Sequence, residues 1–347
     1  MSQRWTAFAF AAPLAVVLLL LAALVPLPYA VYSPGPTYDV LAKDGNEAEI
    51  IQVDGHKTFR DDGQIRFTTV QTSPHGDKKT LFGAIGAWFD PDRAVVPYEV
   101  AHPPDRSPED EELQGALSMV SSQDNAVKVA MEELGYEVGS VMQVAHVDEE
   151  GAAFKKLRVR DKILRADGER LGVDTERLVE IVESHGPGDP VELLIQRGRD
   201  TRLRVEIEPR EVDGEMRIGI IPGIGYDFPF EVSITVDPAI GGPSAGLMFS
   251  LAVYDTLTPG SLTDGGVVAG TGELNAEGKV GPIGGIEQKI AGAEDADAEL
   301  FFVPAGNCAD VAELDPDLEL VKATTMSRAL SSLEAWTEDP DAELPSC

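Results

Sequence analysis

A serine and a lysine in the last third of the chain, Ser244 and Lys289, have the types and setting for covalent chemistry. Ser244 lies in GGPSAGLMFSLAVYDTL, where Pro243 suits the first turn of a helix and an apolar run follows. A serine at a helix N-terminus lies beside unpaired backbone N–H groups, which could stabilise a developing oxyanion. A plain N-cap serine has the same pattern, so this stretch alone leaves both interpretations open.

The base for such a serine cannot be a histidine that follows it in the chain. Gly242–Gly246 matches the G-x-S-x-G elbow, but that motif needs a later histidine, and all five histidines precede it: His56, His75, His102, His146 and His185. Lys289 shares a helical stripe with Ile286, Ile290 and Ala293, which predicts a helix with the lysine on its apolar face. Burial would lower the lysine pKa and provide a neutral amine as a general base. A lysine whose stem packs while its amine reaches water is the alternative.

Three separated motifs, GGPSAG, TGELNAEGKVGPIGGIEQKI and FFVPAGN, resemble the proteolytic domain of Lon-type serine proteases over roughly residues 213–335. The resemblance implies a Lon α/β fold in which Ser244 is the nucleophile and Lys289 the general base. It also implies that Thr271 of the TGE motif is a hydrogen-bond partner of the lysine. Gly242 stands where many Lon enzymes carry an acidic residue, so the resemblance does not extend to the local gating of the site.

The strand GSVMQVAHV, the turn GAAFKKL and the strand DKILRADGERL resemble a PDZ domain of the bacterial, membrane-protease-associated type, over residues 139–208. The resemblance implies that an extended peptide adds as a strand, with its C-terminal carboxylate held by backbone N–H groups. It places this groove along a helix at 175–185 and at Gly139, Ser140, Val141, Met142, Gln143 and Val144. A small β-domain that only spaces its neighbours is the alternative.

An uncharged apolar run covers residues 6–28. At 1.5 Å per residue it is long enough for a hydrocarbon core of about 30 Å, which predicts a single transmembrane anchor after a cytoplasmic tail at residues 1–5. A cleaved signal peptide is the alternative, although the exit PLPYAVYSPG has no clean small-x-small site. Since Arg4 lies on the short side, we expect a single-pass cell-membrane protein with most of its chain extracytoplasmic.

Composition bears on partners and on the domain boundaries. A net charge of −32 argues against nucleic-acid partners, which need phosphate-neutralising cations. Basic residues become scarce after residue 212, which predicts a boundary there. We expect a mixed α+β multidomain chain: a transmembrane helix, an N-terminal extracytoplasmic region at 29–118, a PDZ domain with a leading helix at 119–212, and a Lon-type domain at 213–340.

No cofactor is expected. Five residues rather than four separate Gly272 from Gly278, and Val280 replaces the Ser or Thr of a phosphate loop, which argues against a nucleotide. No group of histidines, cysteines and carboxylates has metal-ligand spacing in the sequence. The two cysteines, Cys308 and Cys347, allow one disulfide or two free thiols.

Anchor, PDZ domain and Lon domain together resemble the secreted-side PDZ–Lon peptidases of bacteria. The prediction is an ATP-independent, membrane-tethered serine endopeptidase acting on extracytoplasmic polypeptides, with the PDZ domain selecting peptide segments. Lys289 would accept the proton of Ser244, whose alkoxide would attack a peptide carbonyl. The alternative is a catalytically silent, peptide-binding scaffold or chaperone, and an esterase is disfavoured because no histidine follows Ser244. Assembly into a homo-oligomer stays open.

Overall fold

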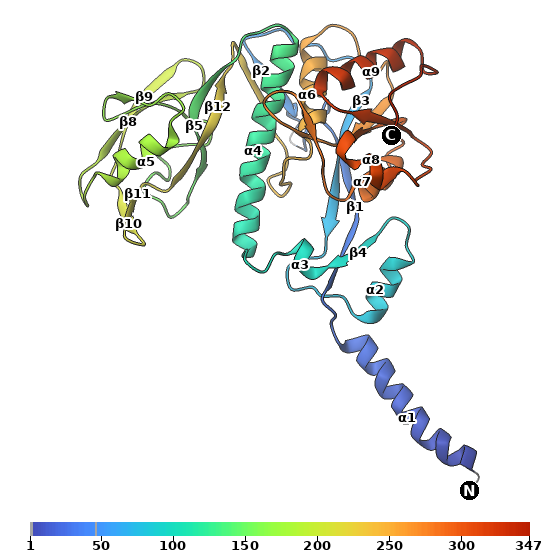
Figure 1. The fold of residues 1–347 in the computed structure, drawn as a ribbon. Helices are drawn as coiled ribbons and strands as arrows, with labels where there is room; N and C mark the ends of the chain where they lie inside the picture. The colour runs from blue at the N-terminus through green and yellow to red at the C-terminus, as the bar shows by residue number, and fades with distance from the viewer. Residues whose placement is uncertain (1–2, 46) are drawn as a thin grey trace.

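The protein has two lobes with a long helix between them, seen in a computed structural model that describes residues 3–45 and 47–347 (Figure 1). Helix α4 (Pro108–Glu133) stands between the lobes, and α1 (Gln3–Leu24) projects away from them. A capping box fixes the start of α4: Ser107 accepts from the Asp110 N–H, and the Asp110 carboxylate accepts from the Ser107 N–H.

The larger lobe is built on a six-stranded sheet with the order β18-β17-β14-β3-β1-β4. Its strands are β1 (Tyr29–Asp39), β3 (Gln64–Thr72), β4 (Ala94–Pro97), β14 (Val267–Gly270), β17 (Leu300–Pro304) and β18 (Glu319–Ala323). Strand β14 runs parallel to β3, with Val267 opposite Gln64, whereas β1 is antiparallel to β3 and β4. Residues 29–118, in which the sequence indicated no chemistry, thus supply three strands of this sheet.

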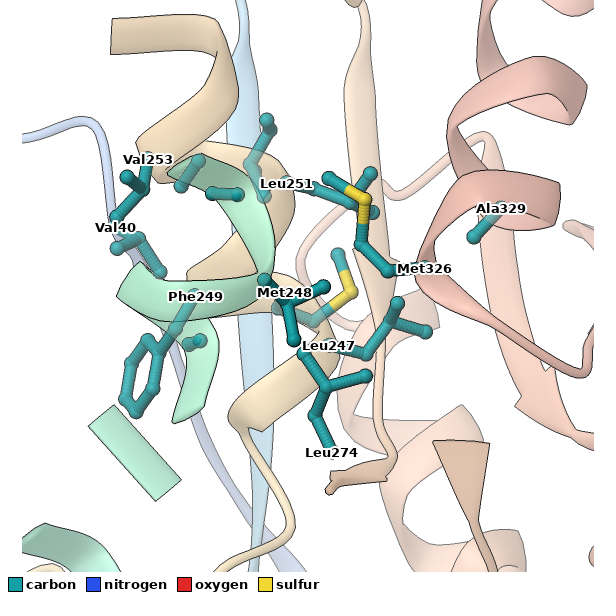
Figure 2. Packing of buried hydrophobic residues seen from close by; sticks show 14 of the residues in the cluster. Val40, Leu247, Met248, Phe249, Leu251, Val253, Leu274, Met326 and Ala329 are labelled. Carbon is teal, nitrogen blue, oxygen red and sulfur yellow. The ribbon is translucent and has the colours of Figure 1, made fainter. Parts of the chain in front are cut away.

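Helix α6 (Gly246–Leu257) forms the centre of the larger lobe because it is apolar on almost every side. In Figure 2 its side chains Leu247, Met248 and Phe249 lie among residues from other elements, Val40, Leu274 and Met326 among them. Burial of a large apolar side chain stabilises a fold by about 1.5–3 kcal/mol. This core therefore fixes the segment that leads into the helix from Ser244.

The other helices and strands of the larger lobe cover this sheet and its edges. α7 (Ile286–Glu294) packs on β1 and β3, and α9 (Met326–Glu338) packs on α6 and β18. The remaining elements are β2 (Ile51–Asp54) with β13 (Glu231–Ile234), β15 (Glu273–Leu274) with β16 (Val280–Gly281), α2 (Leu81–Trp88), α3 (Tyr98–Ala101), the 3-10 helix η1 (Ala305–Asn307) and α8 (Cys308–Val311). A disulfide joins Cys308 to Cys347.

The smaller lobe has its own sheet, with the order β12-β5-β6-β8-β9, and its own apolar core. Its elements are β5 (Gly139–Val147), β6 (Lys162–Ala166), β7 (Glu169–Arg170), α5 (Thr175–Glu183), β8 (Val191–Arg197), β9 (Thr201–Ile207), the hairpin of β10 (Arg210–Val212) and β11 (Glu215–Arg217), and β12 (Ile220–Asp227). Strand β12 follows the composition shift at residue 212 yet pairs with β5, so strands from both sides of that shift share one sheet.

The N-terminal apolar segment differs from the sequence-based prediction of a transmembrane helix at 6–28. Its helix ends at Leu24, because Pro26 and Pro28 follow and cannot continue a helix. Within residues 3–45 and 47–347, no helix combines the length and apolar character that a membrane crossing requires. The anchor at 6–28 therefore stays a prediction. The predicted tail at 1–5 begins outside the described residues.

Candidate active site

Ser244 lies two residues before the start of α6, and hydrogen bonds to its backbone carbonyl fix the turn there. Its carbonyl oxygen accepts from the Gly272 N–H at 2.7 Å and from Thr271 Oγ1 at 3.0 Å. The helix N-cap is Ala245, and Ser244 Oγ accepts from Lys289 instead of capping the helix. Within the described residues, the backbone N–H groups of Ser244 and Ala245 have no hydrogen-bond acceptor. They are therefore available to an anionic oxygen beside the hydroxyl.

Lys289 reaches the serine from α7, the helix that the apolar spacing predicts. Its Nζ lies 2.7 Å from Ser244 Oγ and 3.0 Å from Thr271 Oγ1, and the residue is only 4% exposed. Among the described residues no carboxylate forms an ion pair with it. Burial without a counter-charge lowers the lysine pKa to about 8. The amine is thus buried rather than extended to solvent, and about one-tenth of it is neutral at pH 7.

Thr271, just after the end of β14, joins the two reactive groups. Its Oγ1 donates to the Ser244 carbonyl, so its lone pairs are free to accept from Lys289 Nζ. The residue is fully buried, which limits the rotation of its hydroxyl-bearing side chain. Thr271 is therefore placed to orient the lysine amine toward Ser244 Oγ.

The serine and lysine open into a cavity of about 440 Å³. One side is formed by residues 237–245 and the other by β1 and β3, including Tyr38 and Phe67. Met119 of α4 also lines it. Sequence reasoning missed Tyr38, Phe67 and Met119 because they lie more than 100 residues before Ser244 and reach the site only through long-range strand pairing and packing. The cavity gives a polypeptide segment room to lie against Ser244 Oγ.

Two segments of the chain match known domain families. Residues 236–333 match the family described as Lon protease (S16) C-terminal proteolytic domain, and residues 117–208 match the PDZ domain family. The chain carries a Lon-type serine-peptidase domain and a PDZ domain. Ser244 and Lys289 lie within the Lon-matched segment, whereas the cavity wall formed by β1, β3 and α4 lies outside it.

The similarity to named relatives covers only part of each protein. Lon protease 1 of Herpetosiphon aurantiacus is 37% identical over 102 residues, which are 29% of this chain and 12% of that protein. Lon protease 1 of Sorangium cellulosum is 36% identical over 113 residues, 29% of this chain and 14% of that protein. The match thus spans about one-eighth of the length of these relatives. The PDZ domain of an SdrC-like protein from Listeria innocua is 23% identical, covering 24% of this chain and 92% of that one, with a TM-score of 0.22.

Helix α4 supports the loop that precedes the serine of the Lon-type domain. The Gly115 carbonyl accepts from the Gly242 N–H at 3.0 Å, and Ser122 Oγ donates to the Pro243 carbonyl at 3.0 Å. The backbones are close here: a Cβ atom added to Gly241 would lie 3.1 Å from Gly115 Cα. A larger residue at Gly241 would require α4 or the loop to shift slightly, whereas a Cβ atom at Gly115 would lie at an ordinary contact distance of 3.5 Å.

The peptide groove of the PDZ domain differs from the sequence-based prediction. Residues Gly139–Val144 of β5 pair along their length with β12, and Gln143 pairs with Lys162 of β6 on the other side. Both edges of the predicted strand are therefore occupied, and the edge strand on its side of the sheet is β12. A hollow of about 820 Å³ lies between α5 and residues 210–222. The sequence had indicated α5 but not β12, because a partner beyond residue 212 could not be inferred from local spacing.

Proposed function

We propose that the chain is a serine endopeptidase that hydrolyses polypeptides without ATP, with Ser244 as nucleophile and Lys289 as general base. The observation that carries the proposal is the 2.7 Å contact between Lys289 Nζ and Ser244 Oγ in a buried site where the lysine pKa is lowered. Independence from ATP is supported by the segment at 272–280, which departs from a phosphate loop.

The geometry suggests how each group would act. The neutral Lys289 amine takes the proton of Ser244 Oγ, and the resulting alkoxide attacks the peptide carbonyl carbon. The backbone N–H groups of Ser244 and Ala245 donate to the oxyanion. The lysine ammonium then returns its proton to the leaving amine, and a water deprotonated by Lys289 hydrolyses the acyl-enzyme. Thr271 holds the amine in line throughout.

The lysine pKa sets a pH profile that tests this proposal. Because only the neutral amine can accept a proton, cleavage of an unfolded protein in the absence of ATP should rise about tenfold per pH unit well below pH 8 and level off above the lysine pKa of about 8. Initial rates between pH 6 and 10 would be measured, with circular dichroism as the control for folding. A rate independent of pH across this range, or no cleavage at any pH, contradicts the proposal.

We also propose that the PDZ domain selects substrates through the hollow between α5 and residues 210–222. Val179 lines this hollow and is 45% exposed, so a charge there should disturb the groove rather than the fold. Val179→Glu should raise KM for polypeptides about tenfold, as expected for the loss of about 1.4 kcal/mol of apolar contact, with kcat unchanged.

A matched control exists for this variant. Val173 has a similar exposure of 44% but does not line the hollow, so Val173→Glu should leave KM unchanged. Short peptides that cannot span the two domains should be cleaved equally by all three proteins. Equal losses on short peptides and on polypeptides would argue for a structural role of the PDZ domain instead.

Finally, we propose that the protein acts outside the cytoplasm. Support comes from the disulfide between Cys308 and Cys347, since disulfides persist in oxidising compartments and are rare in the cytosol. Non-reducing mass spectrometry of protein taken directly from cells would test it. Recovery of both cysteines as thiols would contradict this location.

A further inference from the structure

Two histidines and a glutamate converge at the corner where α3 leads into α4, outside the catalytic cavity. His75 lies in the loop after β3, His102 is the C-cap of α3, and Glu111 lies in the first turn of α4. One potential ligand atom from each lies within 4.8 Å of the other two. Spacing in the sequence did not indicate this group of potential ligands. The spacing hid it because the loop, α3 and α4 meet only in the fold.

The protonation of His102 leaves a lone pair pointing into the cluster. Its Nε2 lies 2.8 Å from the Ser73 carbonyl oxygen, which can only accept, so Nε2 carries the proton. Its Nδ1 then faces Glu111 Oε2 at 3.3 Å. Two acceptors at this distance need a second proton or a cation between them. Histidines that bind metals usually donate their other N–H to a carbonyl or carboxylate, as His102 does to Ser73.

Glu111 has coordinating capacity that the protein itself does not use. Its Oε1 is buried and has no hydrogen-bond partner among the described residues. Its ion-pair partners in that part of the chain are His75 and His102, at 3.7 and 3.3 Å from Oε2, and no lysine or arginine contacts it. Two ligand atoms that each lie about 2.1 Å from a tetrahedral ion are about 3.4 Å apart, and the distances from Glu111 Oε2 to the two histidine nitrogens are close to this value.

We propose that His75, His102 and Glu111 bind a divalent transition-metal ion of the zinc class. Two imidazoles and one carboxylate suit zinc and its neighbours, whereas Mg²⁺ and Ca²⁺ prefer oxygen ligands alone. His102 is 8% exposed and anchors the buried side, while His75 is 36% exposed and leaves the fourth position open to water.

The ion would tie the loop after β3, α3 and the first turn of α4 together. Glu111 lies one helical turn before Gly115, whose carbonyl holds the loop in front of the catalytic serine. Metal binding would therefore stiffen the end of α4 that supports this loop.

The test uses the full chain with its disulfide formed, stripped of metal by a chelator and titrated with Co²⁺ and with Zn²⁺. We expect one equivalent of each, seen as d–d absorption for Co²⁺ and as heat in calorimetry for Zn²⁺. His75→Ala and Glu111→Gln should each weaken binding more than about 100-fold, beyond the 10–100-fold typical of losing an outer-shell partner. His75 is exposed, so its variant should remain folded, which the melting temperature without metal would check.

The matched control is His185→Gln. His185 also pairs with carboxylates, at Asp167 and Asp189, but lies in the PDZ domain and should not contribute. We expect this variant to bind one equivalent with wild-type affinity. Failure of the wild-type chain to take up either ion at micromolar concentration would show that the cluster holds only a proton. That result, or wild-type affinity in both His75→Ala and Glu111→Gln, would overturn the proposal.

Discussion

Replacing Lys289 by arginine is expected to lower kcat for polypeptide cleavage by about 10⁴-fold or more. The guanidinium stays protonated at any working pH and cannot accept the Ser244 proton. Lys289→Met, which removes the amine but keeps an unbranched side chain in the 4%-exposed position, should cause a similar loss. Initial rates on an unfolded protein, with the melting temperature of each variant, would measure the effect.

Two further variants separate catalysis from folding. Lys279→Arg makes the same exchange in an exposed loop ten positions earlier and should retain wild-type turnover. Ser244→Ala should be as inactive as Lys289→Met, and the double variant no worse than either, because groups that act as a unit are not additive. Turnover within tenfold of wild type in a folded Lys289→Arg protein would remove the lysine from the mechanism.

Loss of the Cys308–Cys347 disulfide should lower the free energy of unfolding by about 4 kcal/mol. The estimate follows from the 39-residue separation, since opening a loop of this size restores chain entropy to the unfolded state. The bridge also fixes the C-terminal segment, in which the Pro345 carbonyl accepts from the Lys322 N–H and Leu344 packs on the core. Urea denaturation of Cys347→Ser against wild type would measure the difference.

The reduced wild-type protein is the control for this variant. It should unfold at the same urea concentration as Cys347→Ser, and reductant should have no effect on a variant with both cysteines replaced. A loss below about 1 kcal/mol would show that the native contacts of the C-terminal segment hold the chain ends together without the bridge.

Short-range patterns predicted the local parts of the site. The stripe of Ile286, Lys289 and Ile290 predicts one helix that buries the lysine stem, and α7 contains all three residues. Helix α6 likewise follows from its apolar run after Ser244. These features depend on residues within three turns of one another, so periodicity alone could indicate them.

Features built by distant segments could not be predicted in this way. The pairing of β3 with β14 joins residues about 200 positions apart, and nothing in the spacing near Phe67 indicates a wall of the active-site cavity. The same applies to β12 beside β5, and to His75, His102 and Glu111. The apolar run at 6–28 predicted a helix that continues to residue 28, whereas α1 ends at Leu24, before Pro26.

The strands of the larger sheet come from both sides of the PDZ domain in the sequence, which determines when the enzyme first becomes active. The ribosome releases β1, β3 and β4 first, then the whole PDZ domain, and only afterwards β14, β17 and β18. At about 5–20 residues per second, β3 waits about 10–40 s for its neighbour β14. Until the segment after β14 has been synthesised, the chain contains Ser244 but lacks Thr271 and Lys289. A chain that ends before Lys289, whether still under synthesis or broken off, therefore lacks the amine beside Ser244 and cannot cut its neighbours or itself.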